Sequence, residues 1–393
     1  MSVKIGTATD YADLLNILDT FLTATGMALT PSFVGTGNGT IDARGGSAGV
    51  AETITVTFTS VTAFNVVGSV SGSLGSGVVG TPFTSTKANL TITAGGTAFV
   101  ATDAFTFVVT PPWTSLRRTS GSEMIWQAPG NGGLDQIIVG AKVFSDVGAD
   151  YYNWRLGGFI AFDSLLPFTQ QSGYVGGPSQ SIPSPVLNLW NSSIPYWIIA
   201  NGRRVIVIAK VSTVYVSCYL GLINSYMSPG AFPYPLAVGG SMAWDFTIAS
   251  EPASNSVNWR WSYSGAELTN FAKPKGSIST PQGSTMRLRL PSGSWQGFSS
   301  SSNETQYGRV SPYSNIDQTS SDIRANLDGG YTLFPATIWD ITPNQYGELD
   351  GVFDVTGFQQ SSENTITIGG IQHLVVQDVF RTSKSSYFAV KLA

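Results

Sequence analysis

The sequence predicts a mainly β protein, with a β-sandwich-like body, an inserted small β module and one N-terminal helix. Short alternating apolar segments are separated by Gly, Ser and Pro along most of the 393 residues, 44 of which are glycine. This spacing is typical of strands joined by tight turns. Only one segment, 9–24, has the apolar period of a helix. Residues 205–211 (VIVIAKV) are apolar on both alternating faces, which indicates a strand that is covered on two sides.

The N-terminal helix is predicted over Thr9–Ala24. Thr9 or Asp10 can cap its first turn, and Gly26 closes it. Its apolar stripe consists of Leu14, Leu15, Leu18, Phe21 and Leu22. We expect this helix to cover a sheet face or a neighbouring subunit.

The inserted module is predicted over 33–112, between an N-terminal helical segment (1–32) and a main β-rich body (113–393). Its short strands are separated by Gly and Ser, and no helical period is present. Alternation is clear at Ile54, Val56 and Phe58, at Leu90 and Ile92, and at Phe105 and Phe107. Two prolines and a tryptophan at 111–113 mark the end of the module.

The stretch 201–221 (NGRRVIVIAKVSTVYVSCYLG) is expected to form the core of the body. An Asn-Gly turn at 201–202 begins it. As a single strand it is longer than usual, so we expect a bulge or bend near Lys210. Cys218, the one cysteine, lies inside the apolar run, which predicts a small buried hydrophobe and excludes an intrachain disulfide.

The rest of the body is also predicted to be β structure. Further strands are expected at 137–144, 152–162, 257–263, 331–341, 349–355, 379–382 and 387–392. Hairpins are expected at 286–298 and at 365–376, the second turning at Gly369 and Gly370. Three prolines make 227–236 a stiff aromatic loop, and 167–189 is an irregular contact arm.

Charge and composition limit the partners of the chain. Only 11% of residues are charged, against about 25% in a typical domain, while 42% are hydrophobic and 12% aromatic. Such a weakly charged surface suits a subunit that is buried against neighbours. A net charge of −4 with no basic tract gives no reason to expect a nucleic-acid partner. The N-terminus lacks a signal peptide and no segment predicts a membrane helix, so we expect synthesis in the cytoplasm and no membrane insertion.

The sequence predicts no catalytic residues, no metal site and no cofactor. His373 is the single histidine, it has no cysteine partner, and it is expected on the surface or between subunits. No GxSxG, P-loop or GxGxxG motif is present. The acids Glu348, Asp350 and Asp354 alternate along one strand, which favours a solvated or interfacial strand face over a glycosidase pair or a calcium site.

The aromatic residues leave two interpretations open. A carbohydrate platform of stacked rings could be built from Trp154, Trp190, Trp197, Trp244, Trp259, Trp261 and Trp295. Many Trp, Tyr and Arg with few Lys or Glu is, however, the composition of the core of a protein interface. The candidate interface residues are Phe232, Tyr234, Trp190, Trp259 and Trp261.

Several motifs resemble virion structural proteins of tailed bacteriophages. They are YYNWRLGGFIAFD (151–163), NGRRVIVIAKVSTVYVSCYLG (201–221), SYMSPGAFPYPLAVGGSM (225–242), VNWRWSY (257–263) and ENTITIGGIQHLVVQDVFRT (363–382). The resemblance implies a repeated, non-catalytic subunit of the virion, in the tail, baseplate or neck, whose partners are copies of itself and other virion proteins. The alternative is a receptor-binding or carbohydrate-binding protein at the particle surface, an adhesin or head decoration that contacts a host surface glycan. A glycan-degrading enzyme is the least favoured interpretation.

Overall fold

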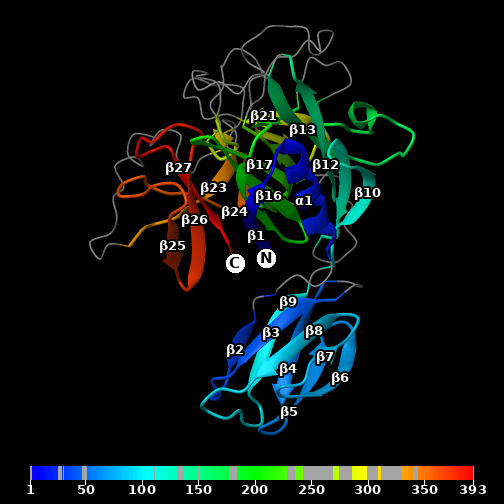
Figure 1. Cartoon of the computed structure of the whole chain (residues 1–393), viewed down its shortest axis with the longest axis vertical. Helices are drawn as coiled ribbons and strands as arrows, with labels where there is room; N and C mark the ends of the chain where they lie inside the picture. Colours follow the sequence, from blue (N-terminus) through cyan, green and yellow to red (C-terminus); the bar gives the residue numbers. More distant parts are fainter. Residues whose placement is uncertain are drawn as a thin grey trace.

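Three stacked sheets form a large body, and two further sheets form a small module that lies apart from it (Figure 1). The computed structural model describes residues 2–24, 29, 31–46, 51–109, 111–130, 137–148, 150–176, 184–227, 235–241, 269–273, 286–298, 309–310, 330–339 and 344–392. Within these residues every strand pairing is antiparallel. The prediction of a mainly β protein with a β-sandwich-like body is confirmed.

The middle layer of the body is a seven-stranded sheet. Its strands are, in spatial order, β1 (Ser2–Ala8), β15 (Ile194–Ala200), β16 (Arg204–Val211), β17 (Val214–Leu222), β19 (Leu236–Gly239), β20 (Met286–Arg289) and β21 (Trp295–Phe298). The Asn-Gly turn at 201–202 joins β15 to β16, and β20 and β21 form the hairpin expected at 286–298.

The prediction of one long strand with a bend near Lys210 was wrong. The chain reverses completely at 212–213, so Lys210 of β16 lies opposite Tyr215 of β17. Ser212 takes a positive φ of 56° at this turn. A Ser-Thr pair lacks the Gly or Asn that usually indicates a two-residue hairpin turn, and the sequence therefore gave no local signal for the reversal.

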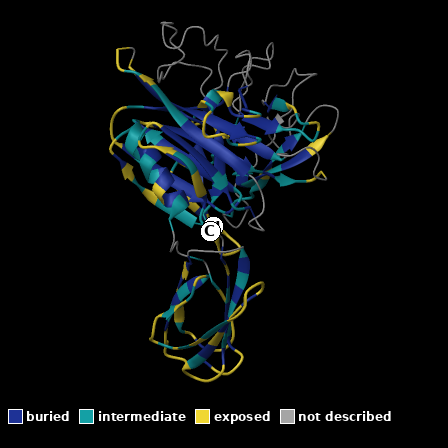
Figure 2. Ribbon diagram, turned by 90° about the vertical axis from the view of Figure 1, so that its right-hand side faces the viewer, coloured by how far each residue is buried: buried dark blue, intermediate teal, exposed yellow. Residues whose placement is uncertain are grey.

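Both faces of the middle sheet are covered, which explains the continuous apolar run. Val205 and Val207 point into one core, shared with the second sheet, and Ile206 and Ile208 point into the other, shared with the third sheet. All four side chains are fully buried, and the strands at the centre of the body are dark blue in Figure 2. Each such side chain stabilises the fold by about 1.5–3 kcal/mol relative to an exposed position.

The second sheet and the helix cover one face of the middle sheet. The strands of the second sheet are β10 (Thr114–Thr119), β11 (Glu123–Ala128), β12 (Ile137–Asp146), β13 (Tyr151–Phe159) and β14 (Val186–Leu189). A short 3₁₀ turn spans Phe168–Gln170. Asp10 is the N-cap of helix α1 (Tyr11–Thr23), and its carboxylate accepts hydrogen bonds from the backbone N–H groups of Ala12 and Asp13. Its predicted apolar stripe is buried in the same core.

The third sheet covers the opposite face. Its strands are β22 (Arg309–Val310), β23 (Phe334–Trp339), β24 (Gln345–Asp354), β27 (Tyr387–Lys391), β26 (Ile371–Gln377) and β25 (Thr365–Ile368), and β18 (Asn224–Ser225) pairs with β24. The predicted turn at Gly369 and Gly370 is confirmed, with φ of 58° and 79°. No strand forms at 379–382: Val379 makes only an isolated bridge to Tyr215.

The module is a sandwich of two sheets. One contains β2 (Ser32–Val34), β9 (Ala104–Val109), β4 (Glu52–Phe58), β5 (Ala63–Gly68) and β6 (Gly72–Val78), and the other contains β3 (Thr40–Gly45), β8 (Ala88–Thr93) and β7 (Phe83–Thr84). Phenylalanines fill the space between the sheets, and the rings of Phe58 and Phe99 stack with centroids 4.0 Å apart.

The chain enters and leaves the module at neighbouring points of the body. The backbone N–H of Trp113 donates to the carbonyl oxygen of Leu22 at 2.9 Å. The Trp113 indole N–H also donates to the carbonyl oxygen of Asn201 at 2.8 Å. Because β1 and α1 precede the module and pack into the body, the body is built from both sides of the insertion.

Candidate functional site

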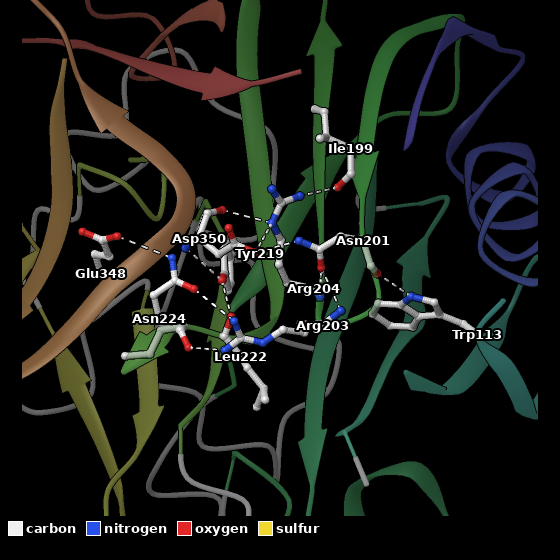
Figure 3. Close-up of polar contacts among 11 residues, drawn as sticks. Trp113, Ile199, Asn201, Arg203, Arg204, Tyr219, Leu222, Asn224, Glu348 and Asp350 are labelled. Carbon is white, nitrogen blue, oxygen red and sulfur yellow. Dashed lines mark hydrogen bonds and ion pairs between the residues drawn. The ribbon is translucent and has the colours of Figure 1, made fainter. Parts of the chain in front are cut away.

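A buried polar junction joins the middle sheet to the third sheet (Figure 3). At its centre Arg204 of β16 is completely buried. Its Nε donates to the carbonyl oxygen of Asp350 at 3.0 Å and lies 3.5 Å from the Asp350 carboxylate, and Nη1 donates to the carbonyl oxygen of Ile199 at 3.0 Å. A buried cation is tolerated only with such partners, so these contacts fix β24 against β16.

The Asn-Gly turn before β16 organises the same junction. The side-chain oxygen of Asn201 accepts the backbone N–H groups of Arg203 at 2.8 Å and Arg204 at 2.9 Å. Its amide nitrogen donates to the carboxylate of Asp350 at 2.7 Å. Asn201 therefore shapes the turn and binds the third sheet with one side chain, as Figure 3 shows.

The carboxylate of Glu348 is also occupied by groups of this chain. Tyr226 donates its hydroxyl to Glu348 at 2.8 Å, and the side-chain amide of Asn224 donates at 3.4 Å. Partial burial and the hydrogen bond to Glu348 raise the pKa of Tyr226 to about 12. Arg203 extends the junction by donating to the side-chain oxygen of Asn224 at 3.1 Å.

The three carboxylates of β24 thus make contacts within the chain. Asp350 binds Arg204 and Asn201, and Asp354 forms an ion pair with Lys273. The interface that these acids occupy is therefore an internal one, between β24 and the neighbouring segments of the same chain. A glycosidase needs two carboxyl groups that flank an accessible sugar, whereas these carboxylates already bind their own chain.

A second polar cluster joins Lys210, Tyr215 and Glu363. The Glu363 carboxylate accepts from Lys210 Nζ at 2.6 Å and from the Tyr215 hydroxyl at 2.5 Å. Burial acts to raise the pKa of Glu363, but these hydrogen bonds outweigh it and lower the pKa. Burial and the hydrogen bond to Glu363 raise the pKa of Tyr215. The cluster therefore joins the hairpin of β16 and β17 to the segment that precedes β25 of the third sheet.

His373 lies inside the third sheet, which contradicts the expectation of a surface or intersubunit histidine. Its side chain is buried, and Nδ1 lies 3.1 Å from the carbonyl oxygen of Ile371. The ring of Phe353 packs edge-on against it at 5.3 Å. Burial lowers the pKa of His373 and favours the neutral imidazole. A polar residue in an alternating strand gives no sign of which face another segment covers.

Cys218 is fully buried in the core between the middle sheet and the second sheet. Burial raises the pKa of its thiol to about 12. The predicted role as a small buried hydrophobe is confirmed, because a thiol in this setting is neither a nucleophile nor a metal ligand at neutral pH.

Of the candidate interface residues, only Trp190 lies in the described part of the chain. It is half-buried at the end of β14, where its indole N–H donates to the carbonyl oxygen of Ser193 at 3.2 Å. Phe232, Tyr234, Trp259 and Trp261 lie outside the described residues, as does Trp244. Trp154 and Trp197 are buried, which contradicts their use as a carbohydrate platform because neither ring face is open to a sugar.

One feature that is exposed for contact has no counterpart among the predicted elements. Residues Ser2–Ala8, considered only as a possible leader, form the edge strand β1 of the middle sheet. Ile5 at its centre is 60% exposed. The apolar residues at positions 3 and 5 were the available signal, but the segment is short and directly precedes a helix.

No family model matches the chain. No curated protein matches it in sequence either. Within the described ranges, no group of three or more His, Cys, Asp or Glu residues is placed to hold a metal ion. Among the same residues, no helix has the length and apolar character needed to cross a bilayer.

Proposed function

We propose that the chain is a structural subunit of a bacteriophage particle, in the tail, baseplate or neck, that acts through protein–protein assembly without catalysis. Its partners are other copies of the chain and other virion proteins, and it resides in the virion after synthesis in the host cytoplasm. The main support is an outward-facing sheet face of the module on which none of the described strand residues is charged.

That uncharged face is the outer side of the five-stranded sheet of the module. On four of the five strands, β2, β4, β5 and β9, its residues alternate with residues that face the core: Ser32, Val34, Thr53, Thr55, Thr57, Ala63, Asn65, Val67, Ala104, Thr106 and Val108. Val34 is 77% exposed and Val108 59% exposed, and exposed positions are yellow on the module in Figure 2. A face of methyl, hydroxyl and amide groups costs less to desolvate than a charged face, which favours contact with another protein.

Composition and two ion pairs within the body support the same proposal. Arg204 binds Asp350 and Lys210 binds Glu363, so these pairs hold layers of the chain together. Only 11% of all residues are charged, so neutral groups must supply most of the exterior. Such an exterior favours association over a dispersed monomer.

Sedimentation velocity combined with light scattering tests the assembly function. We expect the purified full chain to form a defined oligomer whose population increases with concentration. A chain that remains monomeric over the whole accessible concentration range would contradict the proposal. An exposed double substitution on the module, Val34→Glu with Val108→Glu, should reduce higher assembly while the far-UV spectrum stays unchanged.

A surface receptor-binding or carbohydrate-binding role is the second candidate. The projection of the module from the body favours it (Figure 1). The row of threonines at 53, 55 and 57 on the outer face of β4 favours it as well. A glycan array probed with the full chain, and with a chain lacking 33–110, distinguishes the two functions. Binding that disappears with the module would favour the adhesin, whereas absence of glycan binding by an oligomeric chain would favour the structural subunit.

A further inference from the structure

The edge strand β1 leaves one side of the middle sheet open. It pairs with β15 along all seven of its residues, from Ser2 opposite Ala200 to Ala8 opposite Ile194, without a bulge. None of the residues that the structure describes pairs with its other edge. An open edge strand presents unpaired backbone N–H and C=O groups that can bind another strand.

Other edges in the described part of the chain are protected against such pairing. β10 has a bulge between Ser115 and Arg117, and β6 pairs with β5 through another bulge. β3 carries the exposed ion pair of Asp42 and Arg44. The edge strands β2, β7, β14, β21, β22 and β25 have four residues or fewer. Short length, bulges and charges are the usual ways to block edge pairing, and β1 has only one charge, Lys4.

The apolar surface beside this edge is also incomplete. Trp197, the cross-strand neighbour of Ile5, is 8% exposed and belongs to the core between the middle and third sheets. Ile5 lies on the same face, one strand further out, and is 60% exposed. The core therefore ends at an isoleucine that a further strand would cover.

We propose that two copies of the chain join through β1, antiparallel to each other about a two-fold axis at Ile5. The inference rests on the proposed function as a self-associating subunit and adds an interface on the body to the one expected on the module face. In this register Ile5 lies opposite Ile5 of the second copy, Lys4 opposite Gly6, and Val3 opposite Thr7. Two seven-stranded sheets then become one continuous sheet, and the two exposed isoleucines cover each other.

The single charge of the strand disfavours one of the two neighbouring registers. With the axis at Ile5, each Lys4 lies opposite Gly6, so the two lysines are kept apart. A slip that moves the axis to position 4 places the two lysines directly opposite each other, and like charges in a cross-strand pair are destabilising. Lys4 therefore permits self-pairing about Ile5 and disfavours the register whose axis lies at position 4.

Cysteine cross-linking tests this interface directly. Opposed residues in an antiparallel pair have Cα atoms about 4.5–5.5 Å apart, within the range that a disulfide spans. The native Cys218 is buried with a thiol pKa of about 12, so it does not compete. We expect Ile5→Cys to give a disulfide-linked dimer under mild oxidation. Val147→Cys, at a position that is 78% exposed in a turn, is the matched control and should remain largely monomeric.

Mixed cross-linking tests the register. A Val3→Cys chain mixed with a Thr7→Cys chain should form a linked heterodimer, whereas neither variant should link efficiently alone. We expect Ile5→Lys to weaken dimerisation about 100-fold, because each dimer loses two buried isoleucines. Circular dichroism checks that every variant folds.

The outcomes separate this inference from the proposed function. If the wild-type chain is oligomeric but Ile5→Cys links no faster than Val147→Cys, the β1 interface is wrong and the assembly function stands. If the wild-type chain is monomeric and Ile5→Cys does not link, both are wrong. Linking of Ile5→Cys without the mixed product of positions 3 and 7 overturns the register.

Discussion

The backbone N–H of Trp113 donates to the carbonyl oxygen of Leu22, and this 2.9 Å contact closes the body across the inserted module. We therefore expect removal of 33–110 to leave a soluble body, because the remaining segment has only a short gap to span. Differential scanning calorimetry should show that the unfolding transition of the module is lost and that of the body is retained. Loss of all soluble protein on this deletion would show that the body needs the module to fold.

The buried stripe of α1 provides a second prediction. Leu18 is fully buried, so Leu18→Asp places a carboxylate in the core and should destabilise the fold by about 3–5 kcal/mol. Thr20→Asp is the matched control, because Thr20 is exposed on the same helix. Urea unfolding followed by tryptophan fluorescence measures both variants, and equal midpoints would refute the packing of the helix.

The junction between the middle and third sheets predicts a large effect from one carboxylate. Asp350→Ala removes a partner of the buried Arg204 and should destabilise the protein by about 3 kcal/mol. Asp42→Ala breaks the exposed ion pair with Arg44, which water already screens, and should leave stability nearly unchanged. Chemical denaturation of both variants gives the comparison, and a neutral Asp350→Ala would mean that Arg204 is held by its backbone contacts alone.

The buried histidine predicts a dependence of stability on pH. Burial lowers the folded-state pKa of His373 below its ordinary value of 6.5, so the unfolded chain binds more protons in mild acid. The contribution of His373 to stability is fully present above pH 6.5 and is lost as the pH falls through the folded-state pKa. The stability difference between wild type and His373→Asn should therefore change between pH 7.5 and pH 5.5. An unchanged difference would place this histidine in water.

Local patterns predicted most strands of the body because alternation and turn residues are readable within a few positions. The apolar stripe of α1 and the Gly369–Gly370 turn are of this kind. The stacking order of the sheets is not local. Arg204 and Asp350 are 146 positions apart in sequence, and no nearby residue indicates that they meet.

The predictions that were wrong or missing also concern features that depend on distant parts of the chain. The Ser212 turn uses a residue that rarely takes a positive φ, and the surrounding ladder of β16 and β17 fixes it there. The exposure of His373 depends on which segment covers its strand, and that information lies elsewhere in the chain. The edge strand β1 was missed because it is short and its partner β15 follows it only after the module and the second sheet.

The middle sheet contributes one face to each of two hydrophobic cores, so neither outer sheet can detach without exposing one of these faces to water. This arrangement couples the layers of the body into one cooperative unit, in which local opening at the centre is as unfavourable as global unfolding. The body therefore resists deformation as one block, because bending either outer layer would disturb a core that it shares with the middle sheet.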